Sequence, residues 1–212
     1  MTTIVLVRHG ETDWNREGRY QGSRDIPLNA RGSRQAVLLS QGLGMMRFTA
    51  AVASPLRRAA QTAAFVLAGR GVELRTDRRL QEVSHGEWEG MLKTEVEQRW
   101  PELWRRWRET PHEVTMPGGE SLLQVQQRAC AVLAELVAAH PAGTVLVAAH
   151  DATNRAILLH ALGAPLACFW SLKQDPTCVN VLQHTAGAWR VVALNSVAHL
   201  GGLLSGEEHR AV

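Results

Sequence analysis

Three observations predict an α/β protein, a three-layer α/β/α sandwich around a mostly parallel sheet. Apolar runs typical of strands alternate along the chain with segments of helical spacing. The run over 144–149 is almost continuously apolar, which is typical of a strand buried on both faces of a parallel sheet. Polar and charged residues directly follow several of these runs, at the sheet edge where α/β folds bind ligands.

The composition predicts one globular domain over residues 1–212. Hydrophobic residues make up 45% and charged residues 20% of the chain, both ordinary for such a domain. The three cysteines form no C-x-x-C pair, which argues against a disulfide framework or zinc site and favours a reducing compartment. We find no signal-peptide pattern, and no run approaches the roughly 18 apolar residues of a membrane span. We expect a cytoplasmic protein with no membrane partner, and a net charge of +3 alone does not predict nucleic-acid binding.

The first half of the chain predicts alternating strands and helices. We expect a strand over 3–8, a long ordered loop over 12–29, a helix over 30–43, a strand over 51–53, and a helix reaching about residue 69 with Ser54 as its N-cap and Pro55 as its first residue. A further short strand is predicted over 72–75. The loop is long for a compact domain and directly follows a strand, which favours a functional role.

The second half begins with an irregular acidic stretch over 80–90. We then expect a helical segment over 94–108 interrupted at Pro101, a helix to about 140 with a Ser121–Gln124 capping box, a strand over 144–149, a helix over 151–162 and a β-hairpin over 177–194 turning at Ala186-Gly187. A frayed tail is predicted from Gly201. The region over 90–119 reads as a small helical cap inserted above the strand ends.

The strand ends bring together a set of residues that suits phosphoryl transfer. The first strand ends in Arg8-His9, and the strand over 144–149 ends in His150. The junction after 51–53 supplies an arginine to the amino end of a helix, which favours anions, and Glu82 supplies a carboxyl group. Arginines neutralise phosphate oxygens, an imidazole can attack phosphorus, and a carboxylic acid can protonate the leaving oxygen. Taken alone, Arg8-His9 is also compatible with a core strand that ends in a solvated basic turn.

Five sequence blocks resemble the histidine phosphatase superfamily, also called phosphoglycerate mutase-like. In order, they are Leu6-Val7-Arg8-His9-Gly10-Glu11-Thr12 with Trp14-Asn15; Ser54-Pro55-Leu56-x-Arg58-Ala59-x-Gln61-Thr62; Leu80-x-Glu82 with Gly86-x-Trp88-Glu89-Gly90; Pro117-x-Gly119-Glu120-Ser121; and His150 after its strand. The resemblance covers most of the chain, and the occurrence of all five blocks in this order is highly specific.

The resemblance implies a role for each matching residue. His9 would be the phosphorylated nucleophile, Glu82 the proton donor, and Arg8, Arg58 and His150 the rest of the phosphate pocket. On the substrate side it implies Asn15, Gln21, Gly22 and Ser23. The register of the second block selects Arg58, which leaves Arg57 as a solvated helix residue.

The chain departs from the resemblance after His150. Family members commonly have glycines there, whereas this chain has Asp151. We favour Asp151 as the N-cap of the following helix and keep it as a substrate-side candidate, because its charge near a phosphate should disfavour highly anionic substrates.

Other residues receive a structural interpretation. We expect His85 in a surface loop, and the arginines of 105–108 on a solvated helix face. Glu87 and Glu89 are rival acids to Glu82. Trp100, Trp104 and Trp107 read as core or as a contact between cap and body. The remaining histidines lack metal-ligand spacing, so we expect no metal site.

The resulting function hypothesis is a phosphomonoester hydrolase that acts on a small phosphorylated metabolite and needs no cofactor. The alternative is a phosphoglycerate mutase dependent on 2,3-bisphosphoglycerate. Such mutases typically carry an extra insertion after the block of Glu82, whereas the segment between Gly90 and Pro117 is compact here, which favours the phosphatase. A third reading is a non-catalytic module that binds a phosphorylated ligand. An edge strand and exposed tryptophans are both compatible with a homodimer.

Overall fold

The computed structural model describes residues 1–201 and is built on one six-stranded sheet with the order β3-β2-β4-β1-β5-β6. The strands are β1 (Thr2–Arg8), β2 (Ala50–Ala53), β3 (Leu74–Thr76), β4 (Thr144–Ala149), β5 (Val179–Thr185) and β6 (Ala188–Ser196). Strands β1 to β4 pair in parallel, and the β5–β6 hairpin joins β1 antiparallel. The predicted α/β class with a mostly parallel sheet is therefore confirmed. Of the tail predicted from Gly201 onward, all residues after Gly201 lie outside the described residues.

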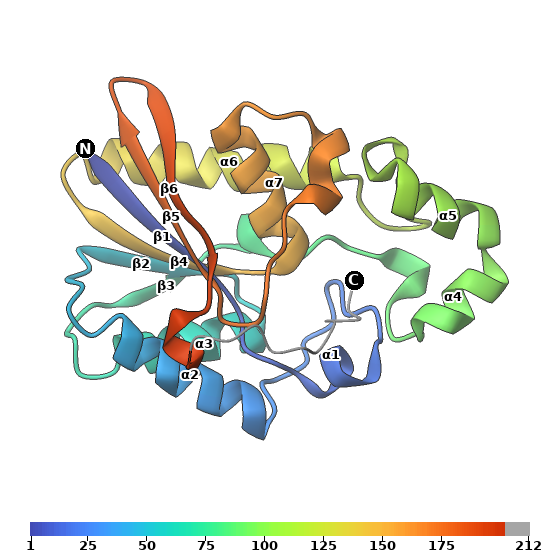
Figure 1. The fold of residues 1–212 in the computed structure, drawn as a ribbon, viewed down its shortest axis with the longest axis horizontal. Helices are drawn as coiled ribbons and strands as arrows, with labels where there is room; N and C mark the ends of the chain where they lie inside the picture. Colours follow the sequence, from blue (N-terminus) through green and yellow to red (C-terminus); the bar gives the residue numbers. More distant parts are fainter. Residues whose placement is uncertain (202–212) are drawn as a thin grey trace.

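Helices cover both faces of this sheet (Figure 1). The α-helices are α1 (Asp13–Glu17), α2 (Ala30–Gly42), α3 (Arg57–Leu67), α4 (Lys93–Arg99), α5 (Pro101–Glu109), α6 (Leu122–Ala139) and α7 (Asp151–Leu162). Helices α2 and α3 lie on one face, and α6 and α7 lie on the other (Figure 1). Within the described residues, no helix is both long and apolar enough to cross a membrane.

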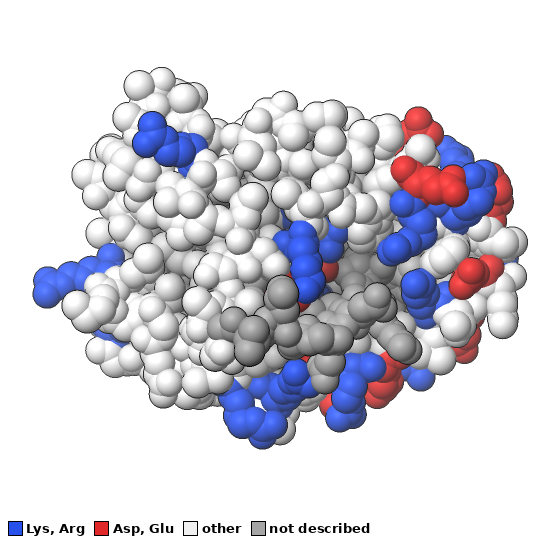
Figure 2. All heavy atoms as spheres, viewed as in Figure 1, with Lys and Arg blue, Asp and Glu red and all other residues white. Residues whose placement is uncertain are grey.

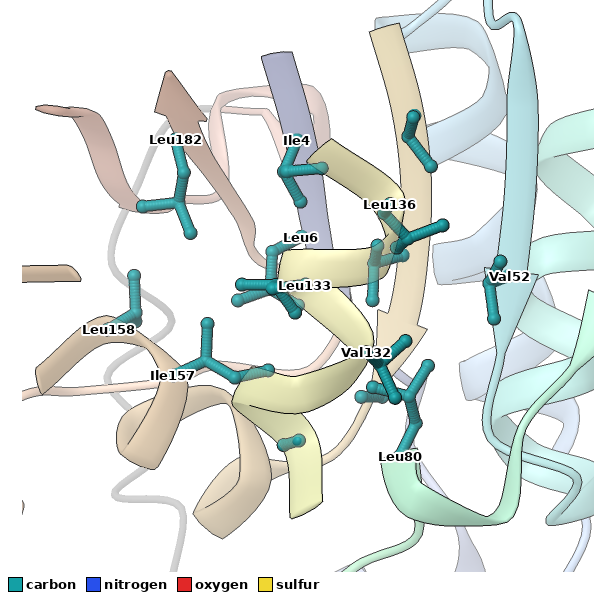
Figure 3. Packing of buried hydrophobic residues seen from close by; sticks show 14 residues of the cluster. Ile4, Leu6, Val52, Leu80, Val132, Leu133, Leu136, Ile157, Leu158 and Leu182 are labelled. Atoms are coloured by element: carbon teal, nitrogen blue, oxygen red, sulfur yellow. The ribbon is translucent and has the colours of Figure 1, made fainter. Parts of the chain in front are cut away.

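Alternate side chains of β1 supply two separate cores, because successive residues of a strand point to opposite faces. Ile4 and Leu6 pack with Leu133 of α6 and Ile157 of α7, as Figure 3 shows from close by. Val5 and Val7 pack into a second cluster with residues of α2 and α3. With both faces covered, β1 and β4 are buried and their carboxyl ends are fixed in place.

Two predicted segments differ in detail from the structure. The expected loop over 12–29 contains the short helix α1. Thr12 and Asn15 form a capping box at its N-terminus. The prediction that Ser54 caps a helix beginning at Pro55 is wrong: α3 begins at Arg57 with Leu56 as its N-cap. The Ser54 hydroxyl instead accepts a hydrogen bond from the Leu56 amide at 3.3 Å.

The segment over 90–119 carries α4 and α5, which lie beyond the sheet in Figure 1. Pro101 separates them and occupies the first position of α5, where its missing N–H costs no helical hydrogen bond. Trp107 of α5 is buried in a third cluster with Tyr20, Trp88 and Phe169. This cluster ties the segment to the body of the protein.

Candidate active site

Parallel pairing of β1 with β4 places His9 beside His150. Arg8 is in register with Ala149, and the His9 amide donates to the Ala149 carbonyl at 3.1 Å. The two imidazole centroids are 5.2 Å apart in an edge-to-face arrangement, and both side chains are buried. The strand ends therefore bring together the two histidines that the sequence singled out.

A hydrogen bond fixes the tautomer of His9. Its Nδ1 lies 2.7 Å from the Gly10 carbonyl oxygen, which can only accept, so Nδ1 carries the proton. Burial, with Arg58 and Arg8 close by, lowers the pKa of His9 well below its ordinary value. A neutral ring with a protonated Nδ1 keeps a lone pair on Nε2. His9 is thus poised as a nucleophile.

Arg8 and Arg58 reach the same place from β1 and α3. Arg8 Nη1 donates to the carbonyl of Gln174, and Arg58 donates to the carbonyls of Arg24 and Gly22 at 2.7 and 2.8 Å. Both guanidinium groups are buried, and burial lowers the pKa of Arg58 to about 10. The Nε atoms of both arginines lack a hydrogen-bond partner.

His150 adds to this unpaired set, because neither of its ring nitrogens has a partner. Burial, then Arg58 and the other nearby cations, lowers the pKa of His150 well below its ordinary value. Unpaired buried donors are costly and rare in folded proteins. Arg8, Arg58 and His9 line one pocket, and His150 packs against His9 behind it, so an anion bound there can accept from the unpaired donors.

Glu82 completes the pocket from the segment after β3. Burial, and secondly the charge of Asp151, raises the pKa of its carboxyl group, although Arg58 opposes this. Arg128 of α6 donates to the backbone carbonyl of Glu82 at 3.1 Å and so holds the segment in place. A carboxyl group with a raised pKa beside a neutral histidine can give a proton to a leaving group.

Only some of the substrate-side residues predicted between positions 15 and 23 line the pocket. Gln21 and Gly22 line the pocket with His9, whereas Asn15 is buried in the capping box of α1. Ser23 is exposed, and its amide and hydroxyl both donate to Glu89 at 2.9 Å.

Glu89 acts as a clamp between two loops. Besides Ser23, its Oε1 accepts from the Ser84 hydroxyl and the His85 amide at 3.2 Å each. The carboxylate thus joins the loop of Gln21 and Gly22 to the loop of His85. Glu82, in contrast, lines the pocket.

The prediction that His85 lies in a surface loop is wrong, because its side chain is only 2% exposed. It lines the pocket together with Arg19 and Tyr20, and its ring lies 4.9 Å from that of Tyr20. Burial lowers the pKa of His85 to about 3, and its Nδ1 has no partner. Tyr20 and Arg19, which the sequence reasoning passed over, directly precede Gln21 in the same loop.

Asp151 is not the N-cap of α7. That position belongs to His150, and Asp151 is the first residue of the helix. Its carboxylate is buried, with Oδ2 3.2 Å from Arg8 Nη1 and Oδ1 2.5 Å from Arg155 Nε. It also lines the pocket.

The surface charges of the α4–α5 segment are mixed. Figure 2 shows basic and acidic side chains interleaved over this part of the face in view. Arg105 pairs with Glu102 and Glu109 at 2.7 and 2.5 Å, all of them exposed. Arg105, Arg106 and Arg108 are all exposed, in agreement with the solvated helix face predicted from the sequence. Among residues 1–201, no group of three or more His, Cys, Asp or Glu side chains is placed to hold a metal ion.

Comparisons with known proteins agree with this geometry. A family model described as histidine phosphatase superfamily (branch 1) matches residues 4–197. Phosphoserine phosphatase 1 of Hydrogenobacter thermophilus is 38% identical over 212 residues, which is all of both chains. Glucosyl-3-phosphoglycerate phosphatase of Mycobacterium tuberculosis is 35% identical over 168 residues, covering 77% of this chain and 71% of that protein. The structure of Bacillus stearothermophilus YhfR superposes with a TM-score of 0.91 at 33% identity, covering 94% of this chain and all of that one.

Proposed function

The chain belongs to the histidine phosphatase superfamily and is a phosphoric monoester hydrolase, and from this premise we propose that it works through a phosphohistidine on His9. The observation that carries the proposal is the cluster of unpaired donors at the ends of β1, β4 and α3. Arg8 Nε, Arg58 Nε and the His150 ring nitrogens are buried without partners around His9. Phosphoryl oxygens can accept from both arginine Nε–H groups and from the one ring nitrogen of neutral His150 that carries a proton.

In the first step, His9 Nε2 attacks phosphorus and the ester P–O bond breaks. The bond electrons go to the leaving oxygen, which takes the proton of Glu82. Nδ1–H stays bonded to the Gly10 carbonyl, which orients the ring and stabilises the positive charge that it gains. The two arginines neutralise the charge on the phosphoryl oxygens throughout.

In the second step, a water attacks phosphorus and the P–N bond breaks, returning the neutral imidazole. Glu82, now a carboxylate, accepts the proton of that water and is ready for the next cycle. The chemistry uses one acid/base group and one nucleophile, both supplied by the chain. In this proposal the helical segment over 90–119 covers the pocket as a cap.

For the substrate we propose a small phosphomonoester that carries a carboxylate, with phosphoserine first. Arg19, Tyr20 and His85 line the pocket beyond the phosphate end, and all three can donate hydrogen bonds. Phosphoserine and glucosyl-3-phosphoglycerate, named for two relatives, both carry a carboxylate besides the phosphate. A carboxylate would take the unpaired Nδ1 of His85.

The test compares phosphate release from phosphoserine and phosphoethanolamine, which differ only by the carboxylate. We expect kcat/KM to be at least about tenfold higher for phosphoserine, because a site built for a polar group rejects the analogue that lacks it. Equal values would overturn the carboxylate proposal. A parallel assay of 3- to 2-phosphoglycerate interconversion with 2,3-bisphosphoglycerate tests the mutase alternative, and we expect no turnover there.

A further inference from the structure

Asp151 lies between two arginines from different elements. Its Oδ2 faces Arg8 Nη1 of β1 at 3.2 Å, and its Oδ1 faces Arg155 Nε, one turn along α7, at 2.5 Å. Asp151 is 2% and Arg155 8% exposed. A lone buried carboxylate beside a phosphate site would repel the ligand and be costly to desolvate. With Arg155 as its counter-charge, the pair is neutral and leaves the positive charge of Arg8 for the phosphate.

Arg155 is itself fixed from the far side. Its guanidinium lies over the rings of Phe169 and Trp170 at 5.1 and 4.9 Å, and its Nη1 donates to the Phe169 carbonyl at 3.3 Å. Trp170 in turn donates from Nε1 to the Trp107 carbonyl of α5 at 2.9 Å. Because Arg155 is held on both sides, it fixes the position of the Asp151 carboxylate.

The carboxylate acts on the orientation of Arg8. Arg8 Nη1 is engaged by Asp151 and the Gln174 carbonyl, whereas its Nε has no partner. A planar guanidinium held at one nitrogen turns its remaining N–H groups in a fixed direction. Asp151 and the Gln174 carbonyl together therefore decide which edge of Arg8 is free for the phosphate.

The same carboxylate faces Glu82. Both line one pocket, and the Ala152 amide, directly after Asp151, donates to Glu82 Oε2 at 3.3 Å. The other charged or titratable groups that line this pocket are Arg8, His9, Arg19, Tyr20, Arg58 and His85, and Arg128 of α6 donates to the Glu82 backbone carbonyl. Asp151 is the one negative neighbour in this set.

We propose that Asp151, fixed by Arg155, is a positioning residue that holds Arg8 toward the phosphate and presents a negative charge to Glu82. This inference rests on the proposed roles of His9 and Glu82. A nearby negative charge disfavours ionisation of a second carboxyl group, in agreement with the raised pKa of Glu82. Asp151 keeps the acid protonated to higher pH and never touches the reacting atoms.

The test measures the pH dependence of kcat/KM for phosphoserine, which reports groups of the free enzyme. Asp151→Asn keeps the shape of the side chain and removes its charge, so the alkaline limb should move to lower pH by about one unit. The inhibition constant of inorganic phosphate should rise about three- to tenfold because Arg8 loses its anchor. An unmoved limb would overturn the inference.

A second variant keeps the test decisive if Asp151→Asn folds poorly. Arg155→Met removes the counter-charge, so the full charge of Asp151 acts on Glu82 and the limb should move the opposite way, to higher pH. Movement of both variants in the same direction would contradict the inference. Near-UV circular dichroism checks the fold of each, and Glu102→Gln, at an exposed ion pair of α5, serves as the control that leaves the profile unchanged.

Glu82→Gln separates this inference from the function on which it rests. If the alkaline limb persists in Glu82→Gln, Glu82 is not the acid and the proposed mechanism fails. If the limb disappears there but stays in place in Asp151→Asn, the mechanism stands and only the role of Asp151 is refuted.

Discussion

The carboxylate of Glu82 accepts a hydrogen bond from the backbone amide of Thr153 at 3.2 Å, although 71 positions separate the two residues. The Ala152 amide donates to the other carboxyl oxygen at 3.3 Å. Both amides belong to the first turn of α7, whose free N–H groups favour a negative charge. Burial nevertheless raises the pKa of Glu82. The helix end thus orients a group that desolvation keeps ready to act as an acid, and it stabilises the carboxylate left after proton transfer.

Glu82→Gln tests this acid. For phosphoserine, whose alkoxide leaving group needs a proton, we expect kcat to fall on the order of 10²- to 10⁴-fold. For p-nitrophenyl phosphate, whose phenolate leaves without much help, the loss should be far smaller. Single-turnover kinetics on both substrates give the comparison. Equal losses would show that Glu82 acts in some way other than protonating the leaving group.

Arg58→Lys tests the phosphate clamp, and Arg57→Lys next to it is the matched control. Arg58 is fully buried and uses its two Nη atoms on the carbonyls of Arg24 and Gly22, whereas Arg57 is exposed. A lysine ammonium lacks the planar, spread donors with which the guanidinium reaches two carbonyls and still presents Nε–H to the phosphate. We expect kcat/KM to fall about 10²-fold in Arg58→Lys and to stay unchanged in Arg57→Lys. Similar losses in the two variants would refute the assignment of Arg58.

His9→Ala tests the covalent intermediate. We expect phosphomonoester turnover to fall by a factor on the order of 10⁴ or more, because the variant loses the group that forms the covalent intermediate. Rapid quenching of the unaltered enzyme with labelled phosphoserine should trap a phosphoenzyme that is stable to base and labile to acid, as a phosphohistidine is. Label on the protein in His9→Ala would place the phosphoryl group elsewhere.

The sequence predicts the strand ends well because the buried strands have strong local patterns. The apolar run over 144–149 and the strand that ends in Arg8-His9 need only parallel pairing to bring His9 and His150 together. The start of α3 is different, because its cap comes from far away in the chain. The Arg57 amide donates a hydrogen bond to Asp25 Oδ1 at 2.6 Å. No local sequence pattern around Ser54 reveals this partner.

The burial of His85 depends on a contact between distant glycine-containing segments. Gly86 has a φ of +54°, and a Cβ there would lie 2.0 Å from the Pro117 carbonyl oxygen. Only glycine permits the loop to pack so closely and turn His85 inward against Tyr20. The prediction for Asp151 is wrong for a related reason: the contact with Arg155 is local, at i+4 on the same helix, whereas the contact with Arg8 joins distant parts of the chain.

The buried histidines predict how stability depends on pH. The pKa values of His9 and His150 are lowered well below the ordinary value, and that of His85 is lowered to about 3, all mainly by burial. The unfolded chain therefore binds protons that the native state does not. The stabilisation is complete above the unfolded histidine pKa of about 6.5 and is lost as the pH falls below it, by about 1.4 kcal/mol per pH unit for each such group.

Urea unfolding between pH 7 and pH 4 in phosphate-free buffer measures this loss. Since the native pKa of His85 is about 3, its contribution to the slope extends from about pH 6.5 down to the acid end of this range. In His85→Gln the decline of the unfolding free energy should be shallower by about 1.4 kcal/mol per pH unit below pH 6. His160→Gln, at an exposed position of α7, should keep the slope of the unaltered protein. If His85→Gln leaves the slope unchanged, His85 takes up its proton in the folded state, and the buried, neutral imidazole assigned to the pocket is refuted.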